Sequence, residues 1–143
     1  MLQAYPVAFT RDSNGTTIAE IPDIPGAMTV GRDRAQARER IQDALVVMLS
    51  GLMDRAEPIP RPSSQKKGQI AIPLPPMVAA KIAIYQAMRA NGLSQSDLAR
   101  KLRCDPKQVR RLLDLDHNSR FDHLEAALSA LGKKLVVDVR DAA

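Results

Sequence analysis

Residues 92–113 of this chain, GLSQSDLARKLRCDPKQVRRLL, predict two short helices joined by a tight turn. Ser94 is followed three residues later by Asp97, which is the spacing of a capping box at a helix N-terminus. Asp105 suits the cap of the second helix, and Pro106 suits its first position because the missing N–H would have no partner there. Two short capped helices across a tight turn are typical of a helix-turn-helix unit.

The second of these helices carries side chains that suit the reading of DNA. Lys107, Arg110 and Arg111 have the i, i+3 and i+4 spacing of one helix face. Arginine offers two parallel donors to guanine in the major groove, and glutamine pairs in the same way with adenine. Gln95, at the N-terminus of the preceding helix, is placed to donate to a phosphate. The predicted DNA-binding residues are Gln95, Lys107, Gln108, Arg110 and Arg111.

Further helices are expected on both sides of this unit. Apolar residues recur with a helical period from Met77 to a turn at residues 91–92. After the unit, we expect Ser119 and Asp122 to cap another helix, which should end at Gly132. Residues 75–143 are therefore predicted to form a helical DNA-binding domain.

The end of the chain predicts a strand without a partner in its own domain. Residues 134–139, KLVVDV, contain four apolar residues, of which three are β-branched valines. An unpaired apolar strand tends to pair with another chain. We therefore expect a homodimer in which this strand pairs with its copy through Leu135, Val137 and Val139, and a tetramer built from two such dimers stays open.

The N-terminal half shows the alternation of apolar and polar residues that is typical of strands. Residues 5–11 and 16–21 predict two strands, and Asn14-Gly15 between them favours a hairpin turn. Residues 28–30 predict a short third strand, and residues 69–72 predict a fourth in the same sheet.

A long amphipathic helix is predicted between the third and fourth strands. It begins at Asp33, which has Gln36 at capping-box spacing, and its apolar residues recur to about Arg55. The spaced prolines of residues 58–62 then predict an extended connector. The expected fold class is α+β, with a small βββαβ domain at residues 1–74 and an all-α helix-turn-helix domain with a C-terminal strand at residues 75–143.

The charge of the chain is unevenly distributed. The whole sequence has a net charge of +5, but residues 66–143 hold 14 basic and 8 acidic side chains whereas residues 1–65 hold 7 and 8. The basic excess therefore lies with the predicted helix-turn-helix, which fits an acidic partner such as double-stranded DNA. An aromatic content of 3% with no Trp argues against a reader of single strands that stacks bases.

Several functional classes are excluded by simple counts. Cys104 is the single cysteine, so no internal disulfide or multi-cysteine metal site is expected and a reducing cytoplasm is the predicted compartment. His117 and His123 are six residues apart, a spacing that matches no metal-binding signature. We expect no export signal and no membrane span, because each apolar stretch is shorter than the roughly 18 residues that are needed. No metal and no cofactor is predicted.

Both halves of the sequence resemble known families. Residues 92–131 resemble the lambda-repressor-like helix-turn-helix of the XRE class, with Leu-Ser-Gln-X-X-Leu-Ala at 93–99 and Ser-Arg-Phe-X-X-Leu-X-X-Ala-Leu-X-X-Leu-Gly at 119–132. The first half resembles the HicB antitoxin family in the order of its motifs. These are YPVAF at 5–9, NG at 14–15, IPDIPG at 21–26, TVGRD at 29–33, Ala44-Leu45 within the long helix and IPRP at 59–62.

This resemblance implies the antitoxin of a type II toxin–antitoxin pair. The N-terminal domain would then have a partial RNase-H-like fold and bind HicA, a small basic ribonuclease toxin, while the C-terminal domain represses the promoter that both genes share. Neutralisation by occlusion needs buried area and charge complementarity rather than catalysis. The acidic residues expected to face such a toxin are Asp23, Glu39, Asp43 and Asp54.

Three other functions compete with this one. An RNase-H-like fold suggests a nuclease, but Asp12, Asp23 and Asp33 each have a structural role as turn, loop or cap residues, so no enzymatic activity is expected. The main alternative is a stand-alone transcription regulator that responds to a small ligand. A second alternative is an adaptor that uses the helical domain for protein contacts.

Overall fold

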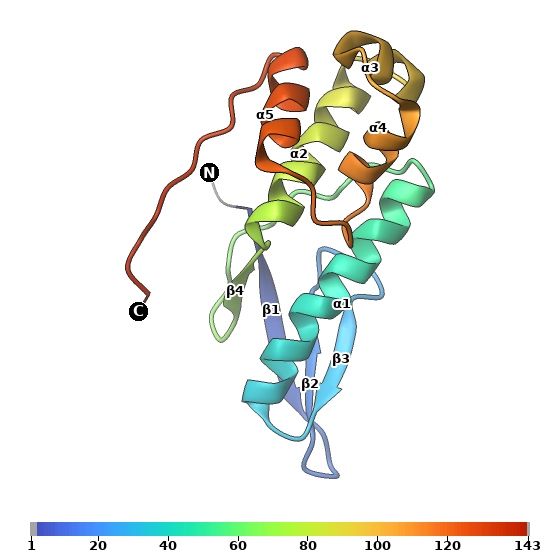
Figure 1. Ribbon diagram of the computed structural model, residues 1–143. Coiled ribbons are helices and arrows are strands. Elements are labelled where there is room, and N and C mark those ends of the chain that lie inside the picture. Colours follow the sequence, from blue (N-terminus) through green and yellow to red (C-terminus); the bar gives the residue numbers. More distant parts are fainter. Residues whose placement is uncertain (1–2, 143) are drawn as a thin grey trace. The chain divides into compact units, whose positions relative to one another are not determined.

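The computed structural model describes residues 3–142, which divide into two compact units at residues 79 and 80 (Figure 1). The first unit contains β1 (Ala4–Arg11), β2 (Thr17–Glu20), β3 (Met28–Gly31), α1 (Arg34–Asp54) and β4 (Ile70–Pro73). The division lies within α2 (Pro76–Ala90), and α3 (Gln95–Leu102), α4 (Pro106–Leu113) and α5 (Phe121–Ala130) follow in the second unit. The chain is thus a mixed α and β protein, and no helix among the described residues is both long and apolar enough to cross a membrane.

The four strands form one antiparallel sheet in the order β3-β2-β1-β4. The predicted hairpin is present, with Asp12 N–H donating to the Thr16 carbonyl at 2.8 Å across the turn. β4 pairs with the start of β1, so that Tyr5 lies opposite Ile72. The predicted strands are therefore confirmed, and β3 lies at one edge of the sheet.

One face of the sheet is covered by α1 (Figure 1). The helix buries a stripe of four residues, Ala37, Ile41, Leu45 and Leu49. Gly31, at the end of β3, lies so close to the helix that an added Cβ would stand 2.4 Å from the Ala37 nitrogen. Only glycine allows this approach of strand and helix.

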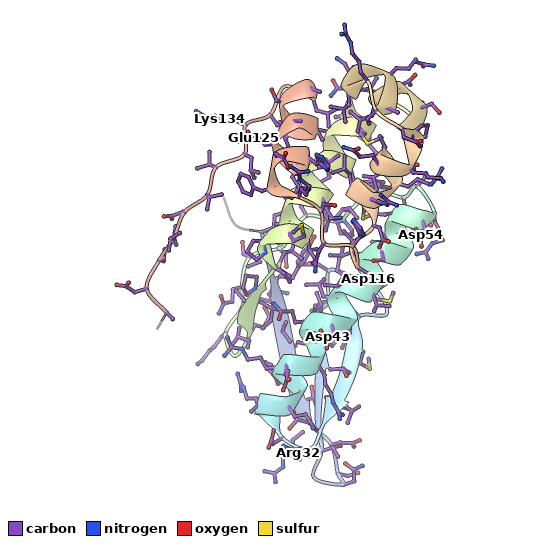
Figure 2. All side chains as sticks on the ribbon, in the orientation of Figure 1. Arg32, Asp43, Asp54, Asp116, Glu125 and Lys134 are labelled. Carbon is purple, nitrogen blue, oxygen red and sulfur yellow. The ribbon has the colours of Figure 1, made fainter. Side chains whose placement is uncertain are left out.

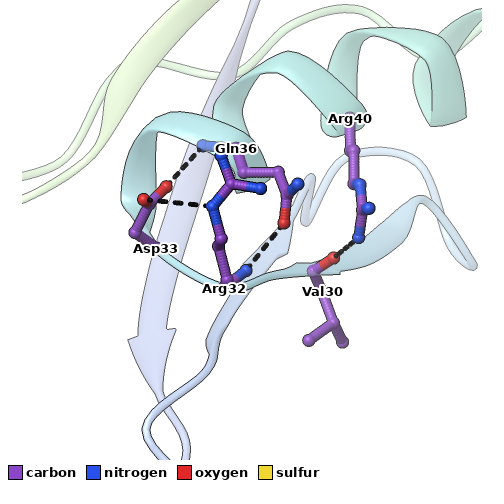
Figure 3. Close-up of polar contacts among 5 residues, drawn as sticks. All are labelled: Val30, Arg32, Asp33, Gln36 and Arg40. Atoms are coloured by element: carbon purple, nitrogen blue, oxygen red, sulfur yellow. Dashed lines mark hydrogen bonds and ion pairs between the residues drawn. The ribbon is translucent and has the colours of Figure 1, made fainter.

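The start of α1 is fixed by the predicted cap (Figure 3). The Asp33 carboxylate accepts a hydrogen bond from the Gln36 N–H at 2.8 Å. The Gln36 side chain, however, accepts from the N–H of Arg32 at 2.9 Å rather than from that of Asp33. Arg40 then donates to the Val30 carbonyl at 2.9 Å, which ties the helix to the edge strand β3.

Within the first unit, polar contacts with two residues hold the proline-rich connector to β1 and to the loop between β2 and β3. The buried Tyr5 hydroxyl donates to the Pro60 carbonyl at 2.7 Å. The Asp23 carboxylate accepts from the N–H and the hydroxyl of Ser63, at 2.8 and 3.1 Å. Burial, followed by the nearby charge of Asp23, raises the pKa of Tyr5 to about 12.

The caps of α3 and α4 are those that the sequence predicts. Ser94 Oγ accepts from the Asp97 N–H at 3.1 Å, and the Asp97 carboxylate accepts from the Ser94 N–H at 2.9 Å, which completes a capping box. Asp105 caps α4 by accepting from the Lys107 N–H at 2.8 Å. Between the helices, Arg103 adopts the left-handed conformation with φ 53°, and the turn is tight.

The predicted cap at the start of α5 is wrong. Ser119 does not cap α5, since the N-cap is Arg120 and it has no side-chain cap bond. The Ser119 hydroxyl instead accepts from the buried Lys81 ammonium at 2.8 Å, because a desolvated charge is a stronger partner than an exposed backbone N–H. Asp122 is likewise engaged by Arg120, with an ion pair at 2.9 Å.

The predicted C-terminal strand is also absent from the described chain. Residues 133–142 form neither helix nor strand, and Figure 1 shows them as a trace that runs on beyond α5. A strand exists only where a neighbouring strand takes its backbone hydrogen bonds, and the described residues offer none to this segment. Its valines are largely exposed, at 73% for Val136 and 89% for Val139.

Candidate functional site

The first candidate surface is the exposed side of α4. Lys107, Arg110 and Arg111 are all exposed. The opposite side of the helix is buried through Val109 and Leu112, at 0% and 1% exposure. The three basic side chains therefore share one solvent face, which we call the α4 basic face.

The other two predicted DNA-binding residues lie around this face. Gln108 is half-buried at its flank, next in sequence to Lys107. Gln95 is the first residue of α3, exposed, and α3 packs against α4. The structure thus gathers four of the five residues on one short helix and leaves Gln95 on the neighbouring one.

Sequence reasoning missed three exposed basic residues close to this face in the chain. Arg100, Lys101 and Arg103 lie on the last turn of α3 and at its C-cap. Arg100 pairs with Asp97, and this carboxylate has its pKa lowered by the Ser94 hydrogen bonds and, to a smaller extent, by Arg100. The sequence RKLR at residues 100–103, shortly before the Asp105 cap of α4, already shows this cluster of basic residues.

Sequence reasoning also missed a buried lysine behind α4. Lys81, on α2, is 0% exposed and is the only charged side chain in the core of the described chain. Its ammonium donates to the carbonyls of Arg111 and Asp114, at 2.6 and 2.8 Å, and to the Ser119 hydroxyl at 2.8 Å. Burial lowers the pKa of Lys81, and the Asp114 charge partly opposes this shift. The sequence does indicate this lysine, because it stands among the apolar residues of a predicted helix.

A cavity of about 180 Å³ lies at the C-terminal end of α4. It brings two of the predicted DNA-binding residues, Gln108 and Arg111, together with both histidines of the chain. Among the described residues, no carboxylate side chain lines it. The lining residues are Gln108, Arg111, Leu112, His117, Asn118, Ser119, Arg120 and His123.

The second candidate surface is one stripe on the solvent side of α1, whose other exposed residues include arginines. Glu39, Asp43 and Asp54 are exposed, and their spacings of four and eleven residues place them within one helical stripe. Val47 follows Asp43 by one turn and is 67% exposed, so a large apolar side chain lies among the acids. We call these four residues the acidic stripe, and Figure 2 labels Asp43 and Asp54 along the helix.

The fourth acid predicted to face a partner does not belong to this stripe. Asp23 is half-buried in the loop between β2 and β3, and its carboxylate is engaged by Ser63. The structure therefore brings three of the four residues together. Within residues 3–142, no group of three or more His, Cys, Asp or Glu side chains is arranged to hold a metal ion.

The residues predicted for dimerisation lie in the C-terminal segment. Leu135 is half-buried, whereas Val137 and Val139 are 62% and 89% exposed. Within the described residues, no strand of the sheet pairs with this segment.

Comparison with known proteins assigns the chain to a family. Residues 4–83 match the model of the HicB-like antitoxins of bacterial toxin–antitoxin systems. The protein named antitoxin HicB 2 of Photorhabdus laumondii is 37% identical over 131 residues, which cover 92% of this chain and 92% of that relative. Antitoxin HicB of Escherichia coli K12 is 33% identical over 92% of this chain and 95% of its own length. This chain belongs to the HicB-like antitoxin family.

Proposed function

We propose that this protein neutralises a small HicA-like ribonuclease toxin by covering it, and that it represses its own operon by binding operator DNA. The observation that carries the proposal is the opposite charge of the two surfaces. The acidic stripe lies in the family-matched unit, and the α4 basic face lies in the other. One chain thus offers one surface to a basic protein and another to DNA.

The acidic stripe suits the toxin because a ribonuclease that holds RNA presents basic side chains. Charge complementarity would speed encounter and orient the partner, while buried apolar area would supply affinity. Val47 gives the stripe an exposed apolar side chain between the acids. Glu39, Asp43 and Asp54 are the proposed contacts, and Asp23 would act indirectly by holding the connector at Ser63.

The α4 basic face suits the major groove. Arg110 and Arg111 are proposed to contact bases, and Lys107 and Gln108 lie in the first turn of the same helix. Gln95, exposed in the first turn of α3, suits a phosphate. A dimer would place two such helices about one DNA turn, roughly 34 Å, apart on a palindromic operator.

We propose that the dimer forms through the C-terminal segment. Its Leu135, Val137 and Val139 would become one face of a two-chain sheet once the segment pairs with its copy. Pairing would cover valines that the single chain leaves in water.

A pull-down from the native cell with the tagged full-length chain tests both roles. We expect one small basic protein whose ribonuclease activity is suppressed by adding this chain, and we expect the chain to shift DNA from upstream of its own gene. Charge reversal at Asp43→Lys should weaken toxin capture and leave the DNA shift intact, whereas Arg110→Ala should do the opposite.

Two outcomes would contradict the proposal. If no ribonuclease is captured while the promoter fragment still binds, a stand-alone regulator that responds to a ligand becomes the better account. If neither variant separates the two activities, the two surfaces are assigned wrongly.

A further inference from the structure

The core of the second unit contains one charged group with an unusual set of partners. The Lys81 ammonium is fully buried and lies against the C-terminal end of α4. Its three contacts, the carbonyls of Arg111 and Asp114 and the hydroxyl of Ser119, are at 2.6 to 2.8 Å. All of these residues belong to the second unit.

The number and type of these partners fit a protonated amine. An ammonium has three donors and no acceptor, and here three oxygen atoms lie within hydrogen-bond distance of it. The carbonyls at a helix C-terminus carry the negative end of the helix dipole. The Arg111 carbonyl lies there and accepts from Lys81 at 2.6 Å, a shorter bond than the one it accepts from the Asp114 N–H at 3.3 Å. The site is therefore built to hold a positive charge at the end of α4.

Packing alone does not require a lysine at this position. A buried charge is costly to desolvate, and an apolar side chain of similar volume often stabilises a core equally well. What the ammonium adds is geometry, because its three contacts join segments that are 30 to 38 residues away from it in sequence. These segments are the last turn of α4 and residues 114–119, which lead into α5.

The joined segments carry candidate DNA-binding groups. The carbonyl that Lys81 holds at 2.6 Å belongs to Arg111, whose side chain lies on the α4 basic face. Ser119, the third partner, lines the cavity that also contains Arg111 and Arg120. If the last turn of α4 and residues 114–119 moved, the basic side chains that they carry would move with them.

We infer that Lys81 is a positioning residue for DNA recognition: its ammonium fixes the end of α4 and the segment 114–119 against α2, so that the α4 basic face has one orientation. This inference rests on the proposed DNA-binding function. Lys81 itself is buried and touches no DNA. It should therefore affect the discrimination between operator and unrelated DNA, and not the general attraction to phosphates.

The test compares Lys81→Met with Lys133→Met in the full-length protein. Both variants lose one positive charge, but Lys133 is exposed and its side chain forms no hydrogen bond or ion pair with the residues that the structure describes. We expect Lys81→Met to lose about tenfold or more in affinity for the promoter fragment, as for the loss of one good base contact. Its affinity for unrelated DNA and the salt dependence of binding should equal those of Lys133→Met, because no phosphate contact is removed.

Hydrogen exchange of the free protein provides a second readout that does not depend on DNA. Amides in residues 111–120 should exchange faster in Lys81→Met, whereas those in α3 should exchange as in Lys133→Met. Ser119→Ala, which keeps the lysine and removes one acceptor, should show the same pattern with a smaller loss, and it serves if Lys81→Met does not fold.

The possible failures can be told apart. If the wild-type protein does not discriminate its promoter from unrelated DNA, the proposed function fails and the role of Lys81 in recognition falls with it. If the wild type discriminates but neither Lys81→Met nor Ser119→Ala changes the affinity ratio, Lys81 is not a positioning residue. Faster exchange with an unchanged ratio would make it a structural residue only.

Discussion

The placement of α1, and with it the acidic stripe, depends on the absence of a side chain at residue 31. In Gly31→Ala, the new Cβ would stand 2.4 Å from the Ala37 nitrogen and 2.9 Å from both the Ala37 Cα and the Asp33 carbonyl oxygen. Ordinary van der Waals contact begins at 3.4 Å, so the start of the helix has to move by about 1 Å. All three atoms are backbone, and no change of rotamer relieves the clash.

The expected cost follows from two effects. Overpacking of a well-packed site costs about 1–3 kcal/mol. The clash also displaces the Asp33 cap, whose bond to the Gln36 N–H is 2.8 Å long and is worth about 1 kcal/mol. We therefore expect Gly31→Ala to lower the free energy of unfolding by about 3 kcal/mol, measured by urea denaturation followed by circular dichroism.

Gly51→Ala is the matched control on the same helix. Its added Cβ meets only the tip of the Arg55 side chain, at 3.2 Å. This side chain is exposed and pairs with Glu57 at the surface, so a small shift of its tip costs little. Replacing glycine in a helix interior should raise the free energy of unfolding by up to about 1 kcal/mol. If Gly31→Ala stays within about 0.5 kcal/mol of the wild type, the close approach of β3 and α1 is wrong.

Four further predictions concern the surfaces and one buried hydroxyl. Arg110→Ala should weaken promoter binding by about 1–3 kcal/mol in a mobility-shift titration, and unchanged affinity would remove it from the site. Val47→Ser should weaken toxin binding by about 1–2 kcal/mol, measured by calorimetry, because it removes an apolar contact without adding a charge, and it should leave thermal stability unchanged because Val47 is 67% exposed; equal affinity would place the toxin elsewhere. Deleting the residues after Gly132 should yield monomers in sedimentation, and a truncated protein that still dimerises would place the interface elsewhere. Tyr5→Phe should cost about 1 kcal/mol through the lost hydrogen bond to Pro60. Because the pKa of Tyr5 is raised from 10.0 to about 12, the wild type should also lose stability as the pH rises through that range. The urea midpoint of Tyr5→Phe should not show this tyrosine-dependent decrease.

The caps were predictable because their partners are close in sequence. Asp33, Ser94 and Asp105 each accept from a backbone N–H two or three residues ahead. Such hydrogen bonds depend on local conformation alone, so the amino-acid sequence predicts them without knowledge of the fold. The face of α4 was predictable for the same reason, because helical periodicity places its basic and its apolar residues on opposite sides.

Ser119 shows where local reasoning fails. Its hydroxyl has the right spacing from Asp122 for a capping box, yet it binds a lysine that is 38 residues away in the chain. Asp23 is similar, since its partner Ser63 is 40 residues away. No short pattern contains both members of such a pair, and only the fold brings them together.

The acidic stripe was only partly predictable. Charge alone predicts its acidic residues, and the spacing of residues 39, 43 and 47 places Val47 in the same row of the helix. Val47 lies outside the row of apolar residues that the helix buries, and it has no charge that would mark it as a contact for a basic toxin. Its exposure, which only the structure gives, makes it a candidate for the centre of the contact.

The C-terminal segment marks the limit of reasoning about a single chain. A sequence such as KLVVDV has a preference for strand, but a strand also needs the hydrogen-bonding edge of a neighbour, which the described residues do not offer it. The prediction of a strand in the isolated chain was therefore wrong, whereas the prediction of pairing between two chains stays open. The missing strand and the proposed pairing have one cause, the lack of a partner edge in the single chain. The valines that are 62% to 89% exposed here are those that pairing would bury. If the segment forms a strand only in the dimer, backbone protection of residues 134–139 should appear at the protein concentration at which dimers form, and not before.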